Sequence, residues 1–219
     1  MASNSQLPDG ISPAHRVYIG VSAMMTFLST LAVFLRLASR TLSVKIKLDD
    51  WTCVGALVFV YGVFITIILS ATVGRSGYPT ELYDRITLER RAKIILANAV
   101  LYNTSVSLAK ISVLLLYRRI FTPVKAFLYV TVAMGLLVLG YWLTTVFGLI
   151  FAYSPVEAQW KPWIPHTMIN YEAYGMAMGI ANIALDLMIL AMPQPLVWHL
   201  QMSHRQKVLL SGLFTLGGL

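Results

Sequence analysis

The sequence predicts an all-α fold, a polytopic transmembrane helix bundle, and two observations support this prediction. Hydrophobic residues make up 58% of the 219 residues and charged residues only 12%, whereas a soluble domain carries about a quarter charged residues. The charges are also segregated, which leaves several uncharged runs of roughly 20 residues, enough to cross a hydrocarbon core of about 30 Å. The lipid bilayer is therefore the first partner that the sequence predicts.

Five apolar runs are long enough to span the bilayer as helices. They cover residues 17–35, 51–73, 94–117, 126–151 and 173–192. A sixth run covers residues 208–219, and its twelve residues rise only about 18 Å as a helix. We therefore expect five complete spans plus part of a sixth, with a polar N-terminal tail at residues 1–16 and one transmembrane domain at residues 17–219.

The basic residues that flank the first span predict the orientation, because Lys and Arg collect in cytosolic loops. One basic residue precedes this span and four follow it: Arg16, and then Arg36, Arg40, Lys45 and Lys47. The first helix usually dominates the orientation, so we expect the N-terminus outside and the first, third and fifth loops in the cytosol. The same concentration of Lys and Arg in loops explains the net charge of +8, so this charge does not indicate nucleic-acid binding and no nucleic-acid partner is expected.

Two ionisable residues lie inside the apolar runs, Lys110 in the third and Asp186 in the fifth. A charge in hydrocarbon costs about 2.5–3.5 kcal/mol or more, so it normally faces the bundle and finds a partner. Lys110 lies about 10 Å before Tyr117 and Asp186 about 9 Å before Met192, at the same side of the membrane. We expect the two side chains to form a pair or to share a buried polar network.

Three further residues are candidate members of this network. Asn182 lies one turn from Asp186, and Asn103 and Ser107 share a helix face with Lys110. One interpretation is structural: Lys110 reaches the cytosolic interface along its aliphatic stem, and Asp186 joins helices. The other is a ligand, ion or switching role, since intramembrane charges are functional candidates.

No constellation typical of an enzyme or a metal site stands out. Cys53 is the only cysteine, which excludes an internal disulfide and a Cys-based metal site. The four histidines are scattered over the tail and the loops: His15, His166, His199 and His204. There is no G-x-S-x-G motif, no P-loop and no pair of intramembrane carboxylates. We expect neither an enzyme nor a bound metal or cofactor.

The ends of the spans carry strings with a characteristic order and spacing. On the expected cytosolic side these residues are Arg36, Arg40, Asp49, Asp50, Trp51, Tyr117, Arg118 and Arg119. Later in the chain follow Pro155 with Trp160, Asn182 with Asp186, and Pro193-x-Pro195-x-x-Trp198-x-Leu200. In this order they resemble the fungal rhodopsin-domain family of seven-helix integral membrane proteins, which includes receptor-like members. The resemblance covers about residues 17–219.

The resemblance implies a seven-helix bundle with an outside N-terminus, of which this chain would lack the end of helix six and helix seven. The family commonly has one Cys before the Pro of the fourth connection and another shortly after it. Those places hold Tyr153 and Met168 here, so both members of the family's disulfide are replaced. Retinal attachment in rhodopsins uses a Lys on helix seven, which this chain does not reach, and the rhodopsin label is an analogy of fold.

Two function classes follow from these residues. The leading hypothesis is a receptor-like or otherwise uncharacterised seven-helix membrane protein of this family, with a small-molecule ligand and a cytosolic signalling partner as candidate partners. The alternative is a membrane transporter that uses Lys110 and Asp186 as a coupling pair. Inverted repeats and interrupted helices would favour the transporter, and neither is evident in the sequence.

Overall fold

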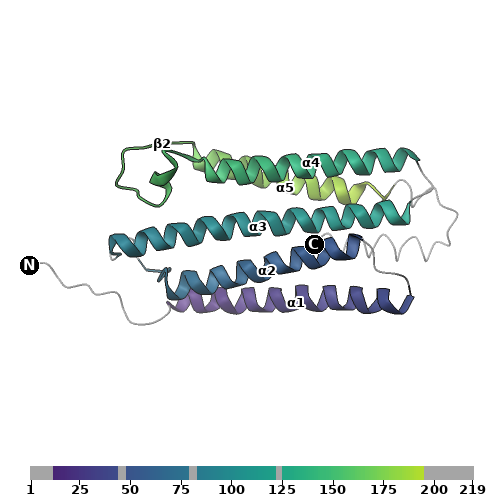
Figure 1. The fold of residues 1–219 in the computed structure, drawn as a ribbon, viewed down its shortest axis with the longest axis horizontal. Coiled ribbons are helices and arrows are strands. Elements are labelled where there is room, and N and C mark those ends of the chain that lie inside the picture. Colours follow the sequence, from purple (N-terminus) through teal and green to yellow (C-terminus); the bar gives the residue numbers. More distant parts are fainter. Residues whose placement is uncertain (1–11, 44–47, 79–82, 122–124, 195–219) are drawn as a thin grey trace, which may run out of the picture.

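A computed structural model of the chain describes residues 12–43, 48–78, 83–121 and 125–194 (Figure 1). In this part of the chain the fold is an all-α bundle of long helices that lie side by side (Figure 1). All five are long and apolar enough to cross a membrane, which confirms the predicted spans. They are α1 (Pro13–Ser43), α2 (Leu48–Thr72), α3 (Arg85–Ile120), α4 (Lys125–Ile150) and α5 (Tyr171–Ala191).

Four of the five helices are longer than the apolar runs that predict them, and α3 shows the reason most clearly. It begins at Arg85, nine residues before the predicted start of the span at residue 94, and its 36 residues rise about 54 Å. Hydropathy detects only the apolar part of a helix, whereas the hydrogen bonds of the helix can continue into the polar residues on either side of that part. The additional turns are polar and carry an i,i+4 ion pair between Lys93 and Glu89, with Nζ 2.6 Å from Oε1.

Helix α3 lies at the centre of the described bundle and packs against α2 on one side and α4 on the other, while α1 lies beyond α2 (Figure 1). Helix α5 contacts α4 and α3. A buried apolar cluster joins α3, α4 and α5 and includes Tyr117, Val138 and Leu185. Large apolar side chains such as Phe27 and Leu136 point outward, as expected where lipid and not water surrounds the helices.

The connection between α4 and α5 contains the two strands found among the described residues. It contains β1 (Tyr153–Ser154), the short 3₁₀ helix η2 (Val156–Gln159) and β2 (Thr167–Met168). The two strands pair antiparallel. The loop lies near the first turns of α3, where the guanidinium of Arg85 lies 5.5 Å from the ring centroid of Trp163.

Several sequence predictions fall outside the residues that the structure describes. These are the sixth apolar run at residues 208–219 and the residues Lys45, Lys47, His199, His204, Pro195, Trp198 and Leu200.

Candidate functional site

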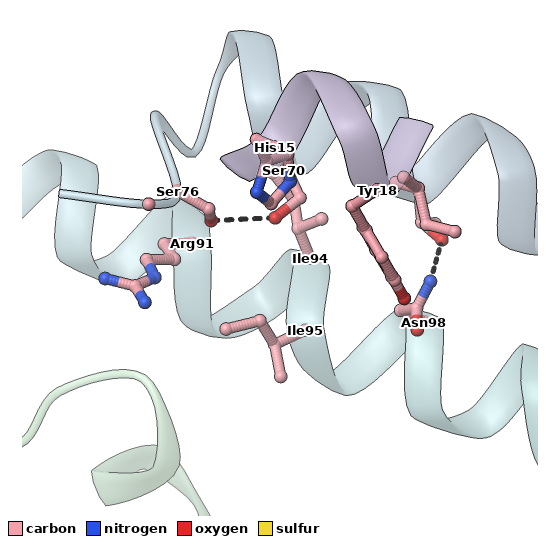
Figure 2. Close-up of a pocket in the computed structure, with 11 residues that line it drawn as sticks. His15, Tyr18, Ser70, Ser76, Arg91, Ile94, Ile95 and Asn98 are labelled. Carbon is pink, nitrogen blue, oxygen red and sulfur yellow. Dashed lines mark hydrogen bonds between the residues drawn. The ribbon is translucent and has the colours of Figure 1, made fainter. Parts of the chain in front are cut away.

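A cavity of about 300 Å³ lies at the end of the bundle where α1 begins (Figure 2). We call it the N-terminal cavity. Its walls come from α1 (His15, Tyr18), α2 (Thr66, Ile67, Ser70), the loop that follows α2 (Ser76, Gly77) and α3 (Arg91, Ile94, Ile95, Asn98).

Hydrogen bonds between α2 and its neighbours hold two walls of this cavity in place. The side-chain amide of Asn98 on α3 donates to Thr66 Oγ1 over 2.7 Å, and the Thr66 hydroxyl donates to the carbonyl of Val63. The hydroxyls of Ser70 and Ser76 lie 2.8 Å apart and join α2 to its following loop (Figure 2). These polar groups therefore satisfy one another.

Two nitrogen-bearing side chains of the cavity lack such partners. The Nε2 atom of His15 is buried and has no hydrogen-bond partner in the described part of the chain. The guanidinium of Arg91 lies 5.0 Å from the ring centroid of Tyr83, whose hydroxyl donates to the carbonyl of Arg75 over 2.7 Å. No Asp or Glu is among the lining residues, so the cavity has a cationic character.

The ion pair between Lys110 and Asp186 lies farther along α3. Lys110 Nζ donates to Asp186 Oδ1 on α5 and also lies 3.3 Å from the carbonyl oxygen of Asn182. The Lys110 side chain is 5% exposed, whereas that of Asp186 is 50% exposed. Lys110 thus reaches across to α5, and the buried partner of this pair is the cation.

The structure brings only part of the predicted polar network together. Asn182 joins it through its backbone carbonyl, while its side-chain Oδ1 has no partner among the described residues. Ser107 is buried, and its hydroxyl likewise has no partner there. Asn103 does not join, because its amide donates to the carbonyl of Ala99 one turn earlier on the same helix, over 2.8 Å.

A cluster of five charged residues lies at the end of the bundle opposite the N-terminal cavity. It contains two aspartates from the first turn of α2 and three arginines, two from α1 and one from α3. We call it the charged cluster: Arg36, Arg40, Asp49, Asp50 and Arg119.

Arg36 makes the shortest contacts within the charged cluster. Its guanidinium nitrogens lie 3.3 Å from Asp49 Oδ2 and 3.3 Å from Asp50 Oδ1. Arg119 approaches Asp49 Oδ2 to 3.5 Å, and Arg40 lies 3.9 Å from the same oxygen. The Asp50 side chain is 0% exposed. Because burying a charge is costly unless the charge is paired, the arginines offset the cost of burying Asp50, and the cluster joins α1, α2 and α3.

The remaining residues that the sequence analysis expected on the cytosolic side have three different surroundings. Tyr117 is buried in the apolar cluster of α3, α4 and α5. Trp51 is 67% exposed, which suits an aromatic side chain at a membrane interface, and Arg118 is exposed. Ser112 was not singled out from the sequence, yet its buried hydroxyl donates to the backbone carbonyl of Asp49 over 2.8 Å.

Sequence reasoning also missed the N-terminal cavity. The signal available was weak: a histidine near the start of the first span and an arginine just before the third, positions at which charged side chains are ordinary. In the described residues no group of three or more His, Cys, Asp and Glu side chains is placed to hold a metal ion.

Comparison with known proteins shows that residues 35–219 match the fungal rhodopsin domain. The chain is 31% identical over 207 residues to the polyenoic acids biosynthesis gene cluster protein Ba17b of Metarhizium anisopliae, which covers 90% of this chain and 55% of that protein. It is 27% identical over 208 residues to Receptor GIN3 of Arthrobotrys oligospora, with 92% and 49% covered.

A SAT4 family membrane protein of Emericella nidulans is 28% identical over 156 residues, which are 70% of this chain and 41% of that protein. The chain therefore spans about half the length of the curated relatives it matches. No solved structure matches it.

Proposed function

Because the chain belongs to the fungal rhodopsin domain family of multi-pass membrane proteins, we propose that it forms part of a membrane receptor. In this proposal a small molecule binds in the N-terminal cavity, and the end of the bundle that carries the charged cluster contacts a cytosolic signalling partner. A relative named as a receptor, with 92% of this chain aligned, supports the proposal.

The observation that carries the proposal is that a single helix reaches all three polar features of the bundle. Helix α3 lines the N-terminal cavity through Arg91, Ile94 and Asn98, forms the intramembrane ion pair through Lys110 and enters the charged cluster through Arg119. Allosteric coupling requires a structural element whose arrangement both sites bias. A shift of α3 caused by a ligand would change the distances in both sets of ion pairs.

The proposed orientation places the N-terminal cavity outside and the charged cluster at the cytosolic face. The basic residues at the cluster end support it, since Arg118 and Lys125 are exposed there and positive residues collect on the cytosolic side. Reporter fusions provide the test: a reporter in the loop between α4 and α5 should read as external. A cytosolic readout from this loop would contradict the orientation.

The proposal includes no catalytic activity and no transport. The transporter alternative receives no support from the names of the relatives. The last residue that α3 contributes to the N-terminal cavity is Asn98, and Lys110 follows twelve positions later, about 18 Å farther along the helix. A coupling pair would need to meet its substrate, and this cavity does not extend to Lys110.

The receptor proposal can be tested in cells that express the full-length protein together with cytosolic reporters of Ca²⁺ and cyclic AMP. Ile94→Trp fills the N-terminal cavity and should abolish a response to an applied small molecule. Ile86→Trp is the matched control, because Ile86 lies on α3, is exposed and does not line the cavity. Substrate flux into proteoliposomes without any signalling response would replace the receptor by a transporter.

A further inference from the structure

The N-terminal cavity has a chemical polarity along its length. Arg91 lies at the Ser76 end of the cavity and Asn98 at the other, with Ile94 and Ile95 between them (Figure 2). From Arg91 to Asn98 is seven residues, or about 10 Å of helix. A ligand that fills the cavity would therefore extend along two turns of α3.

The charge in this cavity is of one sign. Arg91 takes part in none of the ion pairs among the described residues, and its ring partner Tyr83 offers only a cation–π contact. The Nε2 atom of His15, buried and without a partner there, can donate a hydrogen bond in the appropriate tautomer. Two donors thus remain available in a site whose serine, threonine and asparagine side chains bond one another.

The middle of the cavity is apolar. Ile67 of α2 and Ile94 and Ile95 of α3 line it, and hydrocarbon is the chemistry that these side chains accept. A cation would be repelled by Arg91, which has no carboxylate partner among the described residues, and a neutral polar molecule would leave the charge of that guanidinium uncompensated. An amphiphilic anion satisfies both parts, because charge-assisted hydrogen bonds to Arg are strong.

We propose that the N-terminal cavity binds an organic anion whose acidic group lies at Arg91 and His15 and whose short apolar body lies along the three isoleucines. This inference names the ligand class of the proposed receptor and in that sense rests on the proposed function. Binding of the anion itself can be measured without any signalling response. Two kinds of molecule combine an acidic group with an apolar body in this way: a free carboxylic acid anion, and an anionic lipid of the leaflet that surrounds this end of the bundle.

The test uses the full-length protein in nanodiscs of zwitterionic phosphatidylcholine and follows the midpoint of thermal unfolding during titration. Octanoate is the probe, and octanamide, which has the same chain length but no charge, is its control. We expect octanoate to raise the midpoint saturably and octanamide to leave it unchanged. Equal shifts with the two compounds would overturn the proposal without the need for any variant.

A charge-matched pair of variants locates the anion. Arg91→Gln should weaken octanoate binding by about tenfold or more, and Arg91→Lys should restore part of the affinity. Arg90→Gln removes the same charge from an exposed neighbour that does not line the cavity, and it should bind octanoate like the unmodified protein. If Arg91→Gln bound as tightly as Arg90→Gln, the assignment of Arg91 would be wrong.

A second arm of the experiment separates the two sources of the anion. Part of the phosphatidylcholine is replaced by phosphatidylglycerol, and the midpoint is measured without octanoate. A rise that requires Arg91, after which octanoate adds nothing, would identify a lipid headgroup as the anion. A response to neither anion would overturn the proposal, and if signalling to another molecule persisted, the receptor function would still stand. Octanoate binding without any signalling would instead remove the receptor function and keep the site.

Discussion

Tyr153 lies directly opposite Met168 in the antiparallel pair of β1 and β2. These are the two positions at which the family resemblance places a pair of cysteines. Directly opposed residues in antiparallel strands have Cα atoms about 4.5–5.5 Å apart, within the range that a disulfide spans. The loop here holds this geometry with other contacts, among them the side-chain amide of Gln159, which donates to the carbonyl of Leu149 over 2.7 Å.

The strand register predicts that a disulfide can be built at these positions. In a Cys53→Ala background, Tyr153→Cys combined with Met168→Cys should oxidise spontaneously and stabilise the fold by up to about 3 kcal/mol for a loop of this length. The bond is detected by gel mobility with and without reductant, and the stabilisation by thermal unfolding. Tyr153→Cys with Thr167→Cys is the control, since Thr167 pairs with Ser154. Equal oxidation of the two pairs would contradict the register.

The two partners of the intramembrane ion pair are buried to different extents, so we expect substitutions of Lys110 and Asp186 to lower the stability by different amounts. Asp186→Asn leaves the buried ammonium of Lys110 without a counterion and should destabilise the protein by about 2–3 kcal/mol. Lys110→Met removes the buried charge, keeps the volume and should cost less. Thermal unfolding in one detergent ranks the variants. A larger loss for Lys110→Met would show that the carboxylate, and not the ammonium, is the costly partner.

The contacts of the charged cluster predict that the stability of the protein depends strongly on Asp50. Asp50→Asn leaves three arginines with one carboxylate and should cost about 3 kcal/mol, because Asp50 is fully buried. Asp84→Asn is the matched control, since Asp84 is exposed and makes no side-chain capping bond at the start of α3. It should change the stability by less than about 0.5 kcal/mol. Similar losses in the two variants, measured by thermal unfolding, would argue against the cluster.

Replacement by alanine should have opposite effects on stability at two glycines of α4, Gly148 and Gly140. A Cβ atom at Gly148 would collide with the ring and hydroxyl of Tyr174, which donates to the Thr144 carbonyl over 3.0 Å and joins α5 to α4. Gly148→Ala should therefore destabilise the protein. Nothing lies within 4 Å of a Cβ at Gly140, so Gly140→Ala should add up to about 1 kcal/mol of helix propensity. Thermal unfolding compares them, and a gain in both would mean that Tyr174 moves without cost.

The amino-acid sequence by itself determined the fold class and the number of spans in the described bundle. A backbone in lipid must satisfy its own hydrogen bonds, so a long apolar run has helix as its conformation. The fixed rise of a helix also allowed Lys110 and Asp186 to be placed at one depth. The structure pairs the two side chains, since a charge inside a membrane span is costly without a partner at its own depth.

The tertiary structure decided what depth alone leaves open, namely how each helix is rotated about its axis and which neighbour it meets. Asn103 shares a face with Lys110 in sequence spacing but bonds its own helix, since a carbonyl one turn away is always within reach. Arg36, Asp50 and Arg119 come together only because α1, α2 and α3 turn these positions toward one point. The N-terminal cavity likewise exists only between packed helices, where packing side chains leave space that no single sequence segment encodes.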